Sequence, residues 1–252
     1  MIDSLKEVHQ QLLYMLLDFD RVCKENDIKY SLMCGTLLGA VREKGFIPWD
    51  DDVDLIMTRD EYEKFAAIYY TCGADDLVLD TQDTWVPRIF RRGKNKDGLK
   101  EQCFIDIFIL DPISNNPILA GLKILVLMFL QGTLKKNVKY ENYGFIYRIL
   151  LRLTGFIGRF FSHSRKLRWY NYISQKFCVG KKQSFHMSNG AFDLLSQRWP
   201  QELFSTFETA EFEGHHFMIT TRYHEVLIKL YGEDYMTPPP VEQRVATHLS
   251  FE

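Results

Sequence analysis

The chain has 252 residues, is 46% hydrophobic and 25% charged, and carries a net charge of −2, which suits a globular protein with a sizeable core. Its five scattered cysteines form no CxxC pair, and this argues against a disulfide framework or a structural zinc site. The start, MIDSLKEVHQ, lacks the basic and apolar regions of a signal peptide, so we expect a cytoplasmic protein.

Charge is unevenly distributed along the chain. Residues 1–111 hold 14 basic and 22 acidic side chains, residues 121–182 hold 13 and one, and residues 183–252 hold 4 and 10. The balances of −8, +12 and −6 sum to −2, because residues 112–120 are uncharged. A basic stretch that follows an acidic one favours a partner with negative charge.

The first half of the chain alternates helix and strand signals. Ser4-Leu-Lys-Glu7 is a capping box before apolar residues at helical spacing, which continue to about residue 26. Gly35 and Gly45 bracket one short helix, and Asp111-Pro112 ends the strongest strand signal. The other expected elements are strands at 30–33, 54–57, 77–80, 87–91 and 104–110, and a helix from the capping box at 58–61 to about 71. This order predicts an α/β (α+β) fold, a small mixed sheet flanked by helices.

The second half begins differently. ILAGLKILVLMFL (118–130) is apolar on all sides except Lys123, and about 13 residues are too few to span a bilayer. Further expected elements are basic helices at 145–161 and 164–178, a hairpin around 213–214, a helix near 223–231 and an extended PPP segment at 238–240. We therefore expect a core over 1–116, a basic helical insertion over 117–182 and a strand–helix region over 183–252 that packs on the core.

A cluster of acidic residues stands at the start of a predicted strand. GFIPWDDDVDLIM (45–57) places four aspartates within five positions. In a strand, Asp52 and Asp54 share one face while Val53 and Leu55 point into the core. Two carboxylates at this spacing suit a hard divalent cation such as Mg²⁺ or Mn²⁺. The alternatives are a solvated acidic turn and a calcium loop, which Leu55 disfavours because that position requires glycine. We expect Asp51 to face solvent, since it alternates away from Asp52.

A further aspartate lies in an apolar strand. Asp106 interrupts FIDIFIL (104–110), where Phe104 and Phe108 share its face. A buried carboxylate costs several kcal/mol unless it is paired or bound to a metal. The alternative to a metal ligand is an aspartate satisfied by an arginine or by backbone N–H groups.

These pieces are a Gly35-Thr36 loop after one predicted strand, a D-x-D pair on the next and a third aspartate on a later strand. Their arrangement resembles that of the nucleotidyltransferase superfamily. The segment CGTLLGAVREKGFIPWDDDVDL (34–55) resembles, more narrowly, the LicD family of phosphorylcholine transferases, which are related to fukutin-type ribitol-phosphate transferases. The resemblance is close across residues 30–57, continues through FIDIF and resumes at YGEDYMTPPP (231–240). The basic helices match only in general character.

The resemblance implies a metal-dependent phosphotransferase. Such an enzyme moves a phospho-alcohol, typically phosphocholine, from a CDP-activated donor to a sugar hydroxyl of a cell-surface glycan and releases CMP. The matching residues here are Asp52, Asp54 and Asp106, which would hold Mg²⁺ or Mn²⁺ against the donor's pyrophosphate. Asp106 is also the best placed acceptor for the proton of the attacking hydroxyl.

Residues around the acidic cluster are candidates for binding the donor. Backbone N–H groups at Gly35 and Thr36 can approach a phosphate closely. Arg42 and Lys44 could balance charge on the leaving CMP, although for Arg42 a surface salt bridge to a neighbouring acid is an equal alternative. Trp49 either stacks on the cytosine or fills the core.

The sequence alone leaves two other function classes open. One is a nucleotidyltransferase that moves NMP to a small-molecule hydroxyl and releases pyrophosphate; the other is a non-catalytic metal- or glycan-binding module. The glycan acceptor is either free or lipid-linked. Basic and aromatic residues in 117–182 either lie on an anionic membrane at its inner face or bind the acceptor's phosphates. No nucleic-acid motif accompanies them, so we expect no nucleic-acid partner.

Overall fold

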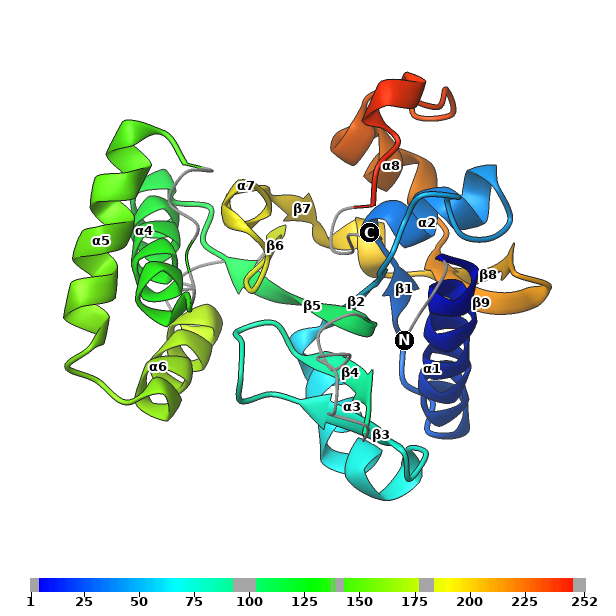
Figure 1. Ribbon diagram of the computed structural model, residues 1–252, viewed down its shortest axis with the longest axis horizontal. Helices are drawn as coiled ribbons and strands as arrows, with labels where there is room; N and C mark the ends of the chain where they lie inside the picture. The colour runs from blue at the N-terminus through cyan, green and yellow to red at the C-terminus, as the bar shows by residue number, and fades with distance from the viewer. Residues whose placement is uncertain (1–4, 93–102, 137, 139–142, 177–183, 247–252) are drawn as a thin grey trace. The chain divides into compact units, whose positions relative to one another are not determined.

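The computed structural model describes residues 5–92, 103–136, 138, 143–176 and 184–246 (Figure 1). Its helices are α1 (Leu5–Glu25), α2 (Cys34–Arg42), α3 (Arg59–Cys72), α4 (Pro117–Leu134), α5 (Phe145–Gly158), α6 (His163–Gln175), α7 (Phe192–Leu195), α8 (Tyr223–Tyr231) and the 3₁₀ turns η3 (Gln201–Phe204) and η4 (Val241–Gln243). Its strands are β1 (Ser31–Leu32), β2 (Val53–Thr58), β3 (Leu77–Asp80), β4 (Arg88–Arg91), β5 (Phe104–Ile113), β6 (Ser184–Met187), β7 (Trp199–Pro200), β8 (Phe207–Phe212) and β9 (His215–Thr220). The predicted mixed α/β class is confirmed.

The chain divides into two compact units, and the division falls inside β5. The first unit comprises Met1–Asp80, Pro87–Ile109 and Pro200–Glu252, and the second comprises Thr81–Val86 and Leu110–Trp199. In the first unit the strands follow the order β1-β2-β5-β4-β3. Pairing is antiparallel between β1 and β2, between β3 and β4, and between β4 and β5.

Aromatic side chains join the helices of the first unit to its sheet. Phe19 of α1 packs edge-on against Tyr30, with ring centroids 4.9 Å apart, and against Phe65 of α3 at 4.7 Å. The predicted N-cap of α3 is confirmed, because the Thr58 side chain accepts a hydrogen bond from the Glu61 N–H. The Glu61 carboxylate accepts from the Lys29 N–H at 2.8 Å. The predicted capping residue of α1 lies outside the described residues.

Two predicted boundaries of elements in or next to the sheet are wrong. The helix α2 begins at Cys34, so Gly35 lies inside its first turn rather than before it. β5 does not end at Asp111-Pro112 but continues to Ile113, since its last residues pair with β6 and Pro112 lies opposite Phe185. A proline ends a strand signal because it lacks an N–H donor, but a position that needs no such donor tolerates it.

The C-terminal part of the first unit forms the predicted hairpin. Glu213 and Gly214 have φ values of 51° and 74°, which is the geometry of a tight turn between two twisted strands. Strand β9 lies beside β1, where the Thr220 N–H donates to Ser31 Oγ at 3.0 Å. The predicted helix at 223–231 is confirmed as α8.

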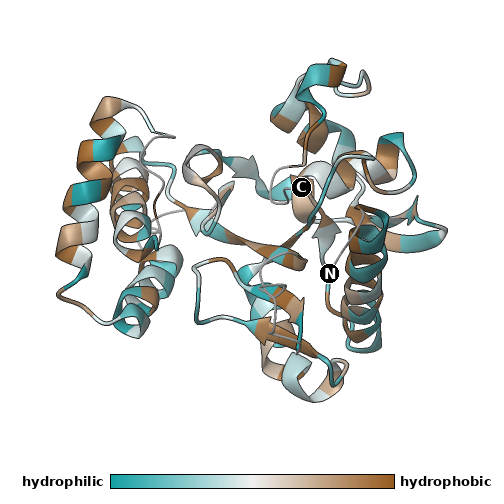
Figure 2. Ribbon diagram, viewed as in Figure 1, coloured by the Kyte–Doolittle hydropathy of each residue, from teal (hydrophilic) through white to brown (hydrophobic). Residues whose placement is uncertain are grey.

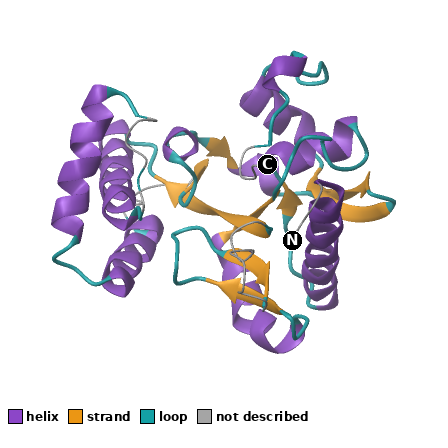
Figure 3. Ribbon diagram, in the orientation of Figure 1, coloured by secondary structure: helices purple, strands orange, loops and turns teal. Residues whose placement is uncertain are grey.

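The second unit contains three helices that pack side by side, α4 against both α5 and α6 (Figure 3). The apolar stretch forms an 18-residue helix, α4, rather than one of about 13 residues, because the helix continues through Gln131–Leu134. By length and composition alone, α4 is the one helix among the described residues that could cross a membrane, and 44% of it is buried inside the protein. Lys123 is 1% exposed, and its Nζ donates to the Pro112 and Ser174 carbonyls at 3.0 and 2.5 Å.

Candidate active site

The loop before β2 is held in place by residues from distant parts of the first unit. The Phe46 N–H donates to Glu213 Oε1 at 3.0 Å, and the Glu213 N–H donates to the Lys44 carbonyl at 2.9 Å. The His9 ring stacks on Phe46 with centroids 4.2 Å apart, and its Nε2 lies 2.7 Å from the Asp50 carbonyl oxygen. The backbone that carries the aspartates is therefore fixed on both sides.

The backbone of Asp54 is fixed as well. Its N–H donates to Thr36 Oγ1 at 2.9 Å, and its carbonyl accepts from the Met33 N–H at 2.9 Å. Val53 and Leu55 are fully buried, which confirms the prediction that both point into the core. Strand β2 thus presents the half-buried Asp54 side chain beside the first turn of α2.

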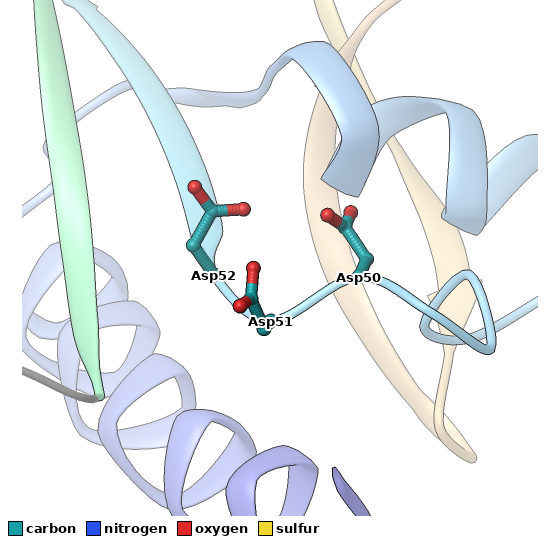
Figure 4. A group of neighbouring side chains, drawn as sticks. All are labelled: Asp50, Asp51 and Asp52. Carbon is teal, nitrogen blue, oxygen red and sulfur yellow. The ribbon is translucent and has the colours of Figure 1, made fainter. Parts of the chain in front are cut away.

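Three carboxylates converge just before β2. The Asp50, Asp51 and Asp52 side chains each offer an oxygen, and these oxygens all lie within 4.8 Å of one another. Figure 4 shows the three side chains turned toward one another. The expectation that Asp51 faces solvent is wrong, since it is 1% exposed. Alternation of faces applies to an extended strand, and β2 begins only at Val53.

The electrostatic field at this site is strongly negative. Burial raises the pKa of Asp54 well above its ordinary value, and the carboxylates of Asp52, Asp106 and Asp50 raise it further, while a hydrogen bond with Cys34 lowers it. Several like charges at short range in a partly buried site are stable only with protons or a cation among them.

The donor set fits a hard divalent cation. All the side-chain ligands in the cluster are carboxylate oxygens, which Mg²⁺ and Mn²⁺ prefer. The structure brings Asp52 together with Asp50 and Asp51 rather than with the whole predicted trio, because Asp54 and Asp106 are not part of the 4.8 Å group. Both still act on the site through their charge.

Asp106 has an arginine partner. Arg88 lies opposite it on β4, and the guanidinium donates through Nε and Nη2 to the two carboxylate oxygens at 2.5 and 3.0 Å. The same guanidinium lies over the Phe104 ring, 4.0 Å from its centroid. The alternative of an aspartate satisfied by an arginine therefore describes this contact. A bidentate pair of this kind fixes the orientation of the carboxylate.

Cys34 is a residue of the site that sequence reasoning missed. It has a φ of 47° and precedes Gly35 at the start of α2. Burial raises the pKa of its thiol, and the carboxylates of Asp54 and Asp52 raise it further. A non-glycine residue in the left-handed region is uncommon, but the sequence carries no local signal for it.

Gly35 and Thr36 lie directly against the aspartates. A Cβ added to Gly35 would stand 2.4 Å from Asp50 Oδ2, so the absence of a side chain is what allows Asp50 to approach α2. Thr36 is 3% exposed, and its hydroxyl accepts the hydrogen bond from Asp54. The Thr36 hydroxyl therefore holds β2 in place. Its backbone N–H is the group of Thr36 that could bind a phosphate.

The other three predicted donor-binding residues also have protein contacts. Arg42 pairs with Glu43 at 2.7 Å and donates to the Tyr235 carbonyl at 3.2 Å. Lys44 Nζ lies 3.4 Å from Glu211, with the lysine side chain 70% exposed. Trp49 is half-buried rather than in the core, and the guanidinium of Arg244 lies over its ring, 5.1 Å from the centroid.

Comparison with known proteins identifies relatives from the family that the segment at 34–55 resembles. A family model described as "LicD/FKTN/FKRP, nucleotidyltransferase domain" matches residues 27–116. The chain is 30% identical over 264 aligned residues to a lipopolysaccharide cholinephosphotransferase, LicD, of Haemophilus influenzae, and the alignment covers 98% of this chain and 96% of that protein. Two uncharacterized proteins, from Rickettsia prowazekii and Rickettsia typhi, are each 53% identical over 51 residues, 19% of this chain and 19% and 16% of theirs.

Proposed function

The chain belongs to the LicD family, and from this membership we propose that it moves phosphocholine from CDP-choline to a sugar hydroxyl of a cell-surface glycan and releases CMP. The observation that carries the proposal is the 30% identity to a lipopolysaccharide cholinephosphotransferase along nearly the whole length of both proteins. The acidic site supports it, because phosphoryl transfer requires charge neutralisation and positioning more than covalent chemistry.

Asp52, Asp54 and Asp106 are the residues proposed to hold a divalent cation. Asp50 and Asp51 lie beside Asp52 and add negative charge to the same site. When bound, Mg²⁺ or Mn²⁺ would offset the charge of the donor's pyrophosphate. The first turn of α2 would direct its unpaired backbone N–H groups to the same phosphates.

The chain's own groups would then position the reaction. The acceptor hydroxyl oxygen forms a bond to the β-phosphorus as the bond to the CMP phosphate breaks, and the hydroxyl proton passes to a carboxylate. Asp106 is proposed for that role, with Arg88 fixing its orientation. Arg42, Lys44 and Trp49 are proposed to contact the donor.

Product analysis tests the proposal. The protein would be incubated with Mg²⁺, a lipopolysaccharide acceptor and one of four donors, CDP-choline, CDP-ribitol, CDP-glycerol or CDP-ethanolamine, with Asp52→Asn as the control. CMP release with CDP-choline supports the proposal, whereas CMP release with another donor alone reassigns the alcohol. Pyrophosphate release from nucleoside triphosphates would instead support a nucleotidyltransferase, as the name of the matching domain allows. A protein that releases neither CMP from the four donors nor pyrophosphate from nucleoside triphosphates would support a binding module.

A further inference from the structure

The helix α5 turns its apolar side away from the protein. Its buried residues Leu151, Thr154 and Gly158 face α4, where an added Cβ on Gly132 would lie 2.5 Å from Thr154 Oγ1. The opposite face of a surface helix is ordinarily polar. Here it carries large apolar side chains, and Figure 2 shows hydrophobic and hydrophilic bands along α5. These side chains are Phe145 (73% exposed), Ile146 (71%), Ile149 (50%), Leu153 (53%) and Phe156 (57%).

The outward face of α4 continues this apolar surface. Its exposed residues recur at helical spacing: Ile118 (78%), Leu122 (50%), Leu125 (65%) and Phe129 (41%). A pocket of about 200 Å³ lies between the two helices, lined by Leu125 and Phe129 from α4 and by Tyr147 and Leu150 from α5. The two helices therefore present one continuous apolar surface, which soluble proteins seldom leave uncovered.

Positive charge borders this surface. Arg148 and Arg152 of α5 and Arg159, which follows directly after its last residue, are exposed and recur at i, i+4 and i+11. This spacing places them on one stripe beside the apolar face of α5. The neighbouring helix α6 adds the exposed Arg165 and Arg168. The sequence from 121 to 182 contains 13 basic residues and one acidic residue, so the net charge of this stretch is strongly positive.

We propose that the α4–α5 face lies on an anionic bilayer, with its apolar side chains in the interface and its arginines among the head groups. A two-fold dimer through this face is disfavoured because α4, α5 and α6 contain no acidic residue that could pair with the arginines of the other copy. The helix α4 lies on the bilayer and does not cross it. Its inner face is committed to the fold through buried Lys123 and through Gln131, which donates to Tyr170 Oη and the Gly190 carbonyl.

Co-sedimentation with vesicles tests this inference, and its readout does not depend on which group the enzyme transfers. The full chain would be mixed with phosphatidylglycerol–phosphatidylcholine vesicles or with pure phosphatidylcholine vesicles, at low and high salt. We expect binding to the anionic vesicles that weakens without vanishing at high salt, because salt screens charge but not apolar burial. The variant Leu153→Glu/Phe156→Glu should bind about tenfold more weakly or worse.

A matched control adds the same charges elsewhere. Met236→Glu/Val241→Glu changes two exposed apolar side chains of the first unit and should bind like the unsubstituted protein. If Leu153→Glu/Phe156→Glu fails to fold by circular dichroism, Arg148→Gln/Arg152→Gln/Arg159→Gln provides the test, and it should lower both the affinity for anionic vesicles and the effect of salt.

Three results would overturn the inference. The first is that the protein stays in the supernatant with anionic vesicles at low salt. The second is an equal loss of binding in the face variant and in its control. The third is a protein that forms a dimer in solution, binds no vesicles, and becomes monomeric in the Leu153→Glu/Phe156→Glu variant, which would assign the face to a second copy.

Discussion

Replacing Gly35 with alanine should separate catalysis from stability. The added Cβ would stand 2.4 Å from Asp50 Oδ2, whereas ordinary van der Waals contact begins at 3.4 Å. The Asp50 carboxylate must therefore withdraw by the difference, 3.4 − 2.4 = 1.0 Å. It can do so because it is the end of a side chain, and the backbone that carries it stays fixed by His9.

The two consequences have different magnitudes. Alanine is favoured over glycine by up to about 1 kcal/mol in a helix interior, so the melting temperature should change little. A displacement of about 1 Å in a catalytic site can lower the rate about 100-fold, or about 2.7 kcal/mol of transition-state stabilisation. We therefore expect Gly35→Ala to fold normally and to lose about two orders of magnitude in kcat.

The assay is CMP release from saturating CDP-choline across a range of Mg²⁺ concentrations, together with a thermal melt of each protein. Gly155→Ala is the matched control, because Gly155 is also within a helix and an added Cβ there meets nothing within 4 Å. A Gly35→Ala protein with wild-type turnover and an unchanged Mg²⁺ requirement would refute the assignment of Asp50 to the working site.

Three further predictions concern charge. Asp52→Asn and Asp54→Asn should each abolish turnover without loss of stability, since removing one of several clustered acids relieves repulsion. Mg²⁺ should raise the melting temperature of the wild type but not of these two variants. Full activity of either variant would contradict the metal site. Arg88→Met should lower the free energy of unfolding by about 2 kcal/mol in urea titrations. This loss is smaller than for a fully buried ion pair because the Arg88 side chain is 32% exposed. Adding Asp106→Asn should recover part of the loss, and purely additive effects of the two substitutions would argue against the pair. Burial and, to a smaller extent, the nearby Lys123 lower the pKa of His186 from 6.5 to about 4. The neutral imidazole therefore contributes up to about 3 kcal/mol to the free energy of unfolding above pH 6.5, and this contribution is lost as the pH falls to about 4. His186→Asn should flatten this pH dependence in thermal melts across that range.

Much of the structure follows from short stretches of sequence. The N-cap at Thr58, the burial of Val53 and Leu55, and the turn at Glu213-Gly214 each depend on residues a few positions apart. Backbone propensity, capping and side-chain periodicity act over that range. The family motif across residues 30–57 is likewise a continuous segment, and it was recognisable without the fold.

Tertiary structure alone decided how the acidic side chains are arranged. The pairing of Arg88 with Asp106 joins residues 18 positions apart and arises from the register of β4 on β5. The burial of Asp51 depends on how the loop before β2 is held by His9 and by Glu213 from the C-terminal hairpin. Such contacts link segments that the chain brings together only when it folds, so no local pattern encodes them. For the same reason, the sequence predicts a helix with basic and aromatic residues over α5, but only its packing against α4 decides which side of the helix is covered.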